Sequence, residues 1–325
     1  MLVSVPVPSV TALRAAPALG LLALGAAVAA VVAAEAERGT SSSPPSPVEP
    51  ATVLRAAANI SGPVVDDGWF AWTRGPIPYR LPMLPHTAVY VRRGRGRPWR
   101  ANPPGTYAQT GGIAAGQLVI QLLHYRSVLA LVDLRTRRLR VLPESINPPH
   151  GVEWRPSMSG RRLLFGRFGA AANDFRIMLA DLKSGRVVRL DDVHGHGAYA
   201  EPGQLNGRYA TWIACPDNHC RAYRYDVVTG RRIEMPPVGG EQYSQLGPSV
   251  TRDGTVYFGV ARGCADVRLM RRRDGRVRTI YRFPAGTSYD YSHATGGRPA
   301  TVYYDETGCS PHALSRIDAI RDVVP

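Results

Sequence analysis

The feature that most constrains this chain is a turn glycine followed by a short apolar run, which recurs six times. The motif occurs at Gly68-Trp-Phe-Ala-Trp, Gly116-Gln-Leu-Val-Ile, Gly160-Arg-Arg-Leu-Leu-Phe, Gly207-Arg-Tyr-Ala-Thr-Trp, Gly254-Thr-Val-Tyr-Phe and Gly297-Arg-Pro-Ala-Thr-Val-Tyr. Successive glycines are 48, 44, 47, 47 and 43 residues apart. An Asp turn follows in step at Asp133, Asp181 and Asp226. We therefore divide the chain between about Thr52 and Val324 into six similar units.

The third unit, residues 150–193, shows the pattern of one repeat most clearly. Residues 163–165 form an apolar run, as expected of a strand buried on both faces. Phe175, Ile177 and Leu179 alternate with other residues at the period of a strand. The segment 181–185 then reads as a turn, in which Asp accepts backbone N–H groups and Gly adopts a positive φ. The unit is therefore predicted to be a four-stranded antiparallel sheet.

A single sheet of this kind has two apolar faces and two open edges, so it is not stable alone. A repeat of 40 to 50 residues is typical of propeller blades, whereas a sandwich has turns every 8 to 12 residues. The pattern predicts an all-β, six-bladed β-propeller over residues 51–325. A leading strand over Thr52 to Ala58, donated to the sixth sheet, is expected to close the ring.

The third to fifth units resemble a known family. Trp154-Arg-Pro-Ser-Met-Ser-Gly-Arg-Arg-Leu-Leu-Phe, followed by Leu179-Ala-Asp-Leu-Lys-Ser-Gly-Arg, is similar to the WD40-like repeat of TolB-type six-bladed β-propellers. The resemblance is strongest over residues 150–280. The first unit departs from it with Arg93-Gly-Arg-Gly in place of the Asp turn, and the fifth has Asp274-Gly. The resemblance implies a fold and leaves function open.

The N-terminal residues 1–36 read as a signal peptide or a transmembrane anchor. Ala15 to Ala34 is uncharged, and twenty residues at ~1.5 Å each would span a hydrocarbon core of about 30 Å. Small residues at Val32 to Ala36 would also suit a signal peptidase. Either alternative places the propeller outside the cytoplasm, secreted or held by a single-pass anchor. Residues 37–50 are a Ser/Pro-rich linker.

The four cysteines fall at equivalent places, after the second strand of three consecutive units. They are Cys215, Cys220, Cys264 and Cys309. Three pairings are possible, and the spacing favours Cys215 with Cys220 inside one loop and Cys264 with Cys309 between adjacent loops. An even number of cysteines outside the cytoplasm indicates disulfides. A zinc site using His219 is the alternative, although no second Cys pair has zinc-ligand spacing.

The basic residues are unevenly placed and give the chain a formal charge of +15. They cluster at Arg92 to Arg100, Arg135 to Arg140 and Arg271 to Arg278. In the blade assignment these clusters lie on the third-to-fourth-strand hairpins. Charge there can protect exposed sheet edges, or it can attract anionic lipids or wall polymers. No nucleic acid partner is expected, because the propeller is expected to lie outside the cell.

The candidate ligand-binding residues lie in inter-blade loops and at the starts of first strands, which should surround the axial mouth of the propeller. They are His150, Glu153, His194, His196, Tyr199, Glu201, Tyr243, Tyr289 and Asp290. His194 and His196 form a His-x-His pair that could chelate a metal. No carboxylate set at fixed spacing accompanies the pair, so an axial pocket without metal is the alternative.

No catalytic residues are predicted. The chain contains no Gly-x-Ser-x-Gly elbow, no His-Glu-x-x-His helix, no phosphate loop and no dinucleotide fingerprint. We expect a monomeric, non-catalytic module without a cofactor, which binds or scaffolds a protein or another component of the cell envelope. The alternative function is that of a metal-dependent hydrolase or lyase acting through the axial pocket.

Overall fold

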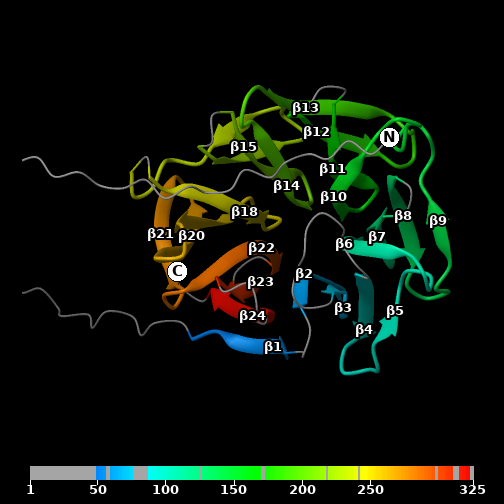
Figure 1. The fold of residues 1–325 in the computed structure, drawn as a ribbon, viewed down its shortest axis with the longest axis horizontal. Helices are drawn as coiled ribbons and strands as arrows, with labels where there is room; N and C mark the ends of the chain where they lie inside the picture. The colour runs from blue at the N-terminus through cyan, green and yellow to red at the C-terminus, as the bar shows by residue number, and fades with distance from the viewer. Residues whose placement is uncertain are drawn as a thin grey trace, which may run out of the picture. The chain divides into compact units, whose positions relative to one another are not determined.

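The computed structural model describes residues 49–55, 59–75, 87–123, 126–169, 173–216, 219–240, 242–296, 299–309 and 315–322. These residues form six four-stranded antiparallel sheets, and no helix occurs among them (Figure 1). The prediction of an all-β six-bladed propeller is therefore confirmed. The signal or anchor segment and nearly all of the linker lie outside the described residues. Within the described residues, no helix is long and apolar enough to span a membrane.

Each sheet is one blade, and its strands follow one another in sequence from the inside of the ring to the outside in blades 1 to 5. Blade 1 contains β2 (Asn59–Asp66), β3 (Trp69–Gly75), β4 (Ala88–Arg93) and β5 (Trp99–Arg100). Blade 2 contains β6 (Tyr107–Ala114), β7 (Gln117–Leu123), β8 (Ser127–Asp133) and β9 (Leu139–Val141). Blade 3 contains β10 (Glu153–Ser159), β11 (Arg162–Phe168), β12 (Asp174–Asp181) and β13 (Val187–His194).

The remaining blades follow the same plan. Blade 4 contains β14 (Tyr199–Asn206), β15 (Tyr209–Cys215), β16 (Arg221–Asp226) and β17 (Arg232–Glu234). Blade 5 contains β18 (Ser244–Val250), β19 (Val256–Arg262), β20 (Asp266–Arg273) and β21 (Arg276–Arg282). Blade 6 contains β22 (Thr287–Gly296), β23 (Ala300–Gly308), β24 (Ser315–Asp322) and, from the other end of the domain, β1 (Ala51–Arg55).

The ring closes through β1, which is the outer strand of blade 6. It pairs antiparallel with β24, from Ala51 opposite Ala319 to Arg55 opposite Arg316. The predicted donation of a leading strand to the sixth sheet is confirmed. The inner strands β2, β6, β10, β14, β18 and β22 contact one another in that order, and β22 contacts β2. The first and last parts of the domain are therefore joined in one sheet.

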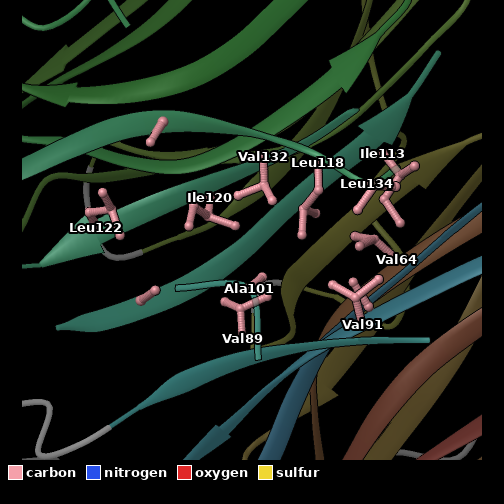
Figure 2. Packing of buried hydrophobic residues seen from close by; sticks show 13 residues of the cluster. Val64, Val89, Val91, Ala101, Ile113, Leu118, Ile120, Leu122, Val132 and Leu134 are labelled. Atoms are coloured by element: carbon pink, nitrogen blue, oxygen red, sulfur yellow. The ribbon is translucent and has the colours of Figure 1, made fainter. Parts of the chain in front are cut away.

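The core of the propeller lies between neighbouring blades. Between blades 1 and 2, Val89 and Val91 of β4 face Leu118 and Ile120 of β7 (Figure 2). The apolar runs identified in the sequence are the second strands, and residues 163–165 are completely buried. A blade removed from the ring would expose apolar side chains on both faces, at about 25 cal/mol for each Å² returned to water.

The repeated glycines form the turns between the first and second strands. Gly68, Gly116, Gly160, Gly207 and Gly254 have φ angles between 57° and 84°. These positive angles explain why glycine recurs at this point of the repeat. Gly297, the sixth member, lies outside the described residues.

The structure corrects one boundary. Tyr289 and Asp290 were assigned to an inter-blade loop around the axial mouth, but β22 begins at Thr287 and is ten residues long. Its partner β23 is also long, and the pairing extends from Thr287 opposite Gly308 to Gly296 opposite Ala300. Tyr289 and Asp290 therefore lie on the inner strand of blade 6. The alternation of Tyr289, Tyr291 and His293 in the sequence was the signal for this strand.

Both disulfide pairings favoured by the sequence are present. Cys215 and Cys220 close the β15–β16 loop, with their Cα atoms 4.1 Å apart. Cys264 and Cys309 join blade 5 to blade 6, with their Cα atoms 6.3 Å apart. The backbone of Gly286 lies between these two cysteines, since it donates to the Cys264 carbonyl and its own carbonyl accepts from Cys309 N–H. Because all four thiols are paired, none is available to ligate zinc.

Ring closure by β1 predicts that two N-terminal truncations differ in their free energy of unfolding. Deleting residues 1–48 should leave the free energy of unfolding unchanged. Deleting residues 1–58 removes the β1–β24 hydrogen bonds and the partly buried Val53 and Leu54, and should lower it by at least about 2 kcal/mol. Urea unfolding of both truncated proteins measures their free energies of unfolding. Equal midpoints for the two truncations would show that β1 does not close the ring.

Candidate axial binding site

The six inner strands share a β-bulge, in which two residues oppose one residue of the second strand. In β2 the bulge separates the pairs formed by Ser61 and Val64, and the other five inner strands have it at the same place. The first bulge residue is a glycine in four blades, namely Gly62, Gly111, Gly203 and Gly247. In blades 3 and 6, which are opposite each other in the ring, it is Arg155 and Asp290.

Close contact between blades explains the four glycines. A Cβ atom at Gly62 would lie 2.4 Å from Thr110 Oγ1 in the next blade, and one at Gly247 would lie 2.3 Å from the Asp290 carbonyl oxygen. Arg155 does carry a side chain at this position, with φ of 42°. A non-glycine residue at such an angle is strained, and strain of this kind often marks a functional site. Arg155 is therefore the residue around which we build the site.

Arg155 connects three blades through its two terminal nitrogens. Its Nη1 donates to Glu201 of blade 4, and its Nη2 lies 3.2 Å from Asp290 Oδ2 of blade 6. Tyr199 donates its hydroxyl hydrogen to the other oxygen of Glu201. Beside this network, buried Asp305 accepts hydrogen bonds from the backbone N–H of Tyr291 at 2.7 Å and of Gly62 at 3.2 Å.

Burial gives this network unusual proton affinities. Burial raises the pKa of Glu201 to about 7, although Arg155 acts to lower it and Asp290 adds to the rise. Burial, together with the charge of Asp290, also raises the pKa of Asp305 to about 7. Burial alone would lower the pKa of Arg155, but Asp290 and Glu201 raise it well above its usual value. Three carboxyl groups thus surround one permanently charged guanidinium, and two of them exchange protons near neutral pH.

An open pocket of about 380 Å³ lies over this network. Arg155, Asp290 and Asp305 supply its charged groups. The rest of the wall is mostly hydroxyl and amide side chains from blades 1, 2 and 6: Asn59, Ser61, Thr73, Gln109, Thr110 and Ser288. Such a wall can donate and accept several hydrogen bonds at once, which suits a polar group of a larger ligand.

An aromatic patch adjoins the charged network where the inner strands of blades 3 and 4 begin. We use this name for Trp154, Phe168, Phe175 and Tyr199, whose ring centroids lie 5.1 to 6.2 Å from their neighbours. Trp154 directly precedes Arg155, so the patch and the charged network are continuous. Phe168 keeps 39% of its surface exposed, as does the neighbouring Val152. These are among the few large apolar side chains exposed in the described part of the chain.

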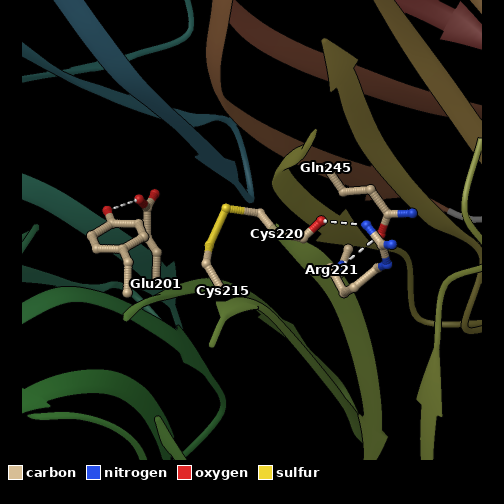
Figure 3. The surroundings of a disulfide bond; sticks show 7 residues. Glu201, Cys215, Cys220, Arg221 and Gln245 are labelled. Carbon is tan, nitrogen blue, oxygen red and sulfur yellow. Dashed lines mark hydrogen bonds between the residues drawn. A yellow bond between two sulfur atoms is a disulfide. The ribbon is translucent and has the colours of Figure 1, made fainter. Parts of the chain in front are cut away.

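The Cys215–Cys220 disulfide supports the site from blade 4. Cys215 pairs directly with Tyr199 in the sheet, and Figure 3 shows Glu201 beside the disulfide. Beyond the disulfide, the Cys220 carbonyl accepts a hydrogen bond from Gln245 N–H of blade 5 at 3.2 Å. The loop therefore holds the strand that carries Tyr199 and Glu201. We call this end of the propeller, where the inner strands begin, the upper face.

The predicted site residues separate into three groups. Tyr199, Glu201 and Asp290 belong to the charged network. Glu153 is fully buried against Arg167 at 2.8 Å, Tyr243 donates to Asp266 at 2.8 Å, and buried Tyr289 donates to the Gly247 carbonyl at 2.8 Å. These three side chains pack between or within blades, and none of them lines the axial pocket.

The histidines lie elsewhere. His150, His194 and His196 are exposed on inter-blade connections, and none of them lines the axial pocket. His194 ends β13, the outer strand of its blade. Within the residues that the structure describes, no group of three or more His, Cys, Asp or Glu side chains could hold a metal ion.

Arg155, Asp305 and Phe168 were not predicted. Arg155 had a sequence signal, because the bulges of blades 1 and 5 read Gly62-Pro and Gly247-Pro whereas blade 3 reads Arg155-Pro. A residue that replaces a repeated glycine deserves comparison with its equivalents in the other units. Asp305 had no such signal, since its importance comes from burial opposite the bulge of β22.

Fold and site together define a six-bladed β-propeller with a charged axial pocket. No family model and no curated protein matches this sequence. Solved structures do share the fold. TolB from Acinetobacter baumannii is 14% identical, with a TM-score of 0.48, over 73% of this chain; the chain spans only 60% of the length of that protein.

Two further structures are matched over more of their length. A putative TolB from Agrobacterium tumefaciens is 13% identical over 82% of this chain and 92% of its own, with a TM-score of 0.55. A luciferin-regenerating enzyme is 10% identical over 84% and 95%, also with a TM-score of 0.55. The resemblance to TolB-type propellers inferred from the repeats is confirmed at the level of the fold. Identities this low carry no information on ligands or activity.

Backbone strain at Arg155 predicts an order of stability for two substitutions. Arg155→Gly and Arg155→Ala both leave Glu201 buried without its cation, so both should be less stable than the natural protein. Glycine tolerates φ of 42°, whereas alanine keeps the strain, so Arg155→Gly should be more stable than Arg155→Ala by about 1 kcal/mol. Urea unfolding measures the difference. The reverse order would show that the backbone at this position is not strained.

The raised pKa of Glu201 predicts a dependence of stability on pH. Between about pH 4.5 and 7 the folded protein holds a proton on Glu201 that the unfolded chain has released, so stability falls as pH rises through this window. Glu201→Gln keeps the shape and the Tyr199 contact but cannot titrate. Its free energy of unfolding should therefore fall less steeply, by at most about 1.4 kcal/mol per pH unit. If the free energies of unfolding of the two proteins changed with pH in the same way, the pKa of Glu201 would not be raised in the folded protein.

Proposed function

We propose that this protein is a non-catalytic binding module that acts outside the cytoplasm and holds a protein partner on its upper face. The observation that carries the proposal is the continuity of the aromatic patch with the charged network, through the hydrogen bond from Tyr199 to Glu201. Exposed Phe168 and Val152 supply apolar area, and the open pocket over the charged network supplies hydrogen-bonding groups. Aromatic anchors next to a site with several hydrogen-bonding groups are characteristic of the energetic centres of protein interfaces.

The axial network supports a role in holding a ligand in a defined position. Arg155 is already fixed by Glu201 and Asp290 from two other blades, and Glu201 is fixed by Tyr199. Charged groups that are held before binding lose little freedom when a partner arrives. A polar side chain or chain end of the partner would enter the pocket, while an apolar residue next to it would pack on Phe168.

Two observations support a location outside the cytoplasm. Both disulfides are of the kind that persists in oxidising compartments. The apolar segment Ala15 to Ala34 would serve as an export signal or single-pass anchor. The propeller would then act as a monomer at the cell envelope. The Arg clusters on the third-to-fourth-strand hairpins would face away from the upper face, toward anionic lipids or wall polymers.

Capture of partners from envelope extract tests the proposal with a matched pair of variants. Phe168→Asp places a charge in the aromatic patch, whereas Val228→Asp places one at another exposed apolar residue, on the β16–β17 hairpin at the opposite end of blade 4. The partner recovered with the natural protein should decrease at least tenfold with Phe168→Asp and stay unchanged with Val228→Asp. Equal recovery with both variants would place the interface elsewhere.

A further inference from the structure

The outer hairpin of blade 5 carries a second cavity with a different chemistry. Strands β20 and β21 pair with Arg271 opposite Arg278 and Arg273 opposite Arg276. Residues directly opposite one another in an antiparallel pair point to the same side of the sheet. Four guanidinium groups are thereby gathered on one side of a two-stranded ribbon. Together with Asp274 they line a cavity of about 330 Å³.

The charge in this cavity is only partly balanced. Buried Arg271 forms two hydrogen bonds of 2.9 Å with Asp322 of blade 6, which anchors the ribbon. Arg273 Nε is 3.7 Å from Asp274 Oδ2, and Asp274 is 80% exposed. Arg276 and Arg278 are exposed, and neither forms an ion pair within the described residues. Counting these four arginines against the two aspartates leaves a net charge of +2 on the cavity.

The surroundings of the ribbon do not relieve this excess. On its other side, Arg272 is partly buried, and its pKa is lowered by burial and by the positive charges of Arg224 and Arg231 of blade 4. Like charges directly opposite each other destabilise a strand pair. Protection of a sheet edge requires charge but does not require four arginines converging on one cavity. A bound anion would offset the repulsion between these arginines.

We propose that this cavity, the blade 5 arginine site, binds a phosphoryl group. Arginine forks match the geometry of tetrahedral oxyanions and bind them through paired hydrogen bonds. The cavity is at the lower limit of ligand pockets, which suits one phosphoryl group with part of its substituent. Its place on an outer hairpin makes it accessible to a phosphate carried by a polymer or a lipid headgroup. The site lies apart from the upper face and does not depend on the function proposed for that face.

The first test is calorimetric titration of the full-length protein with inorganic phosphate at constant ionic strength, against chloride. Arg276→Ala/Arg278→Ala should raise the Kd at least tenfold. The matched control is Arg135→Ala/Arg138→Ala, which removes the same charge from the equivalent hairpin of blade 2 and should change the Kd less than twofold. Arg276→Lys/Arg278→Lys keeps the charge without the forks and should still weaken binding. All four positions are exposed on hairpins, and unchanged thermal midpoints check that the variants fold.

Two outcomes overturn the proposal: no phosphate binding by the natural protein, or equal losses in the two alanine pairs, which would indicate general attraction to a basic surface. Further titrations identify the source of the phosphate. If poly(glycerol phosphate) binds more tightly than inorganic phosphate, the natural ligand is a polymer. If phosphatidylglycerol vesicles bind more tightly than phosphatidylcholine vesicles, the ligand is a lipid. If neither binds more tightly than inorganic phosphate, the ligand is a small soluble phosphate. Phe168→Asp should bind phosphate normally, so failure of the upper-face proposal is distinguishable from failure of this one.

Discussion

Contact between neighbouring blades is the constraint on which the whole molecule depends. Each blade is apolar on both sides, so it gains stability only when two neighbours cover it. The inner strands approach so closely at their bulges that four of six blades have glycine there, and a single Cβ at Gly62 or Gly247 would overlap the adjacent blade. At the first bulge position only two blades carry a side chain, and these side chains are Arg155 and Asp290.

This packing explains why the axial site is chemically unusual. Arg155 has to adopt a strained backbone angle to place its guanidinium between blades 4 and 6. Removal from water then raises the pKa of the carboxyl groups of Glu201 and Asp305 toward neutrality, in spite of the nearby cation. The strain and the desolvation both oppose folding. They are tolerated because the surrounding ring is held by its cores, by β1 and by the Cys264–Cys309 bridge.

The two ends of the propeller present different surfaces because each strand alternates direction. Inner strands start at the upper face, where the second-to-third-strand loops and both disulfides also lie. The third-to-fourth-strand hairpins all emerge at the opposite end, and the three Arg clusters are on them, as the blade assignment predicted. Apolar and hydrogen-bonding groups are thus concentrated at one end and positive charge at the other. One rigid ring could hold two chemically different partners at once.

Local and periodic features could be read from the sequence alone. The glycine period predicted the six blades, and the placement of the cysteines after second strands favoured the observed pairings, because turn conformation and strand alternation are short-range properties. Tertiary structure decided the site. The inner strands come together from units 40 or more residues apart. The Arg155–Asp290 contact, the burial of Tyr289 and Glu153, and the packing of the aromatic patch on Tyr199 of blade 4 therefore depend on how blades pack, which no local pattern encodes.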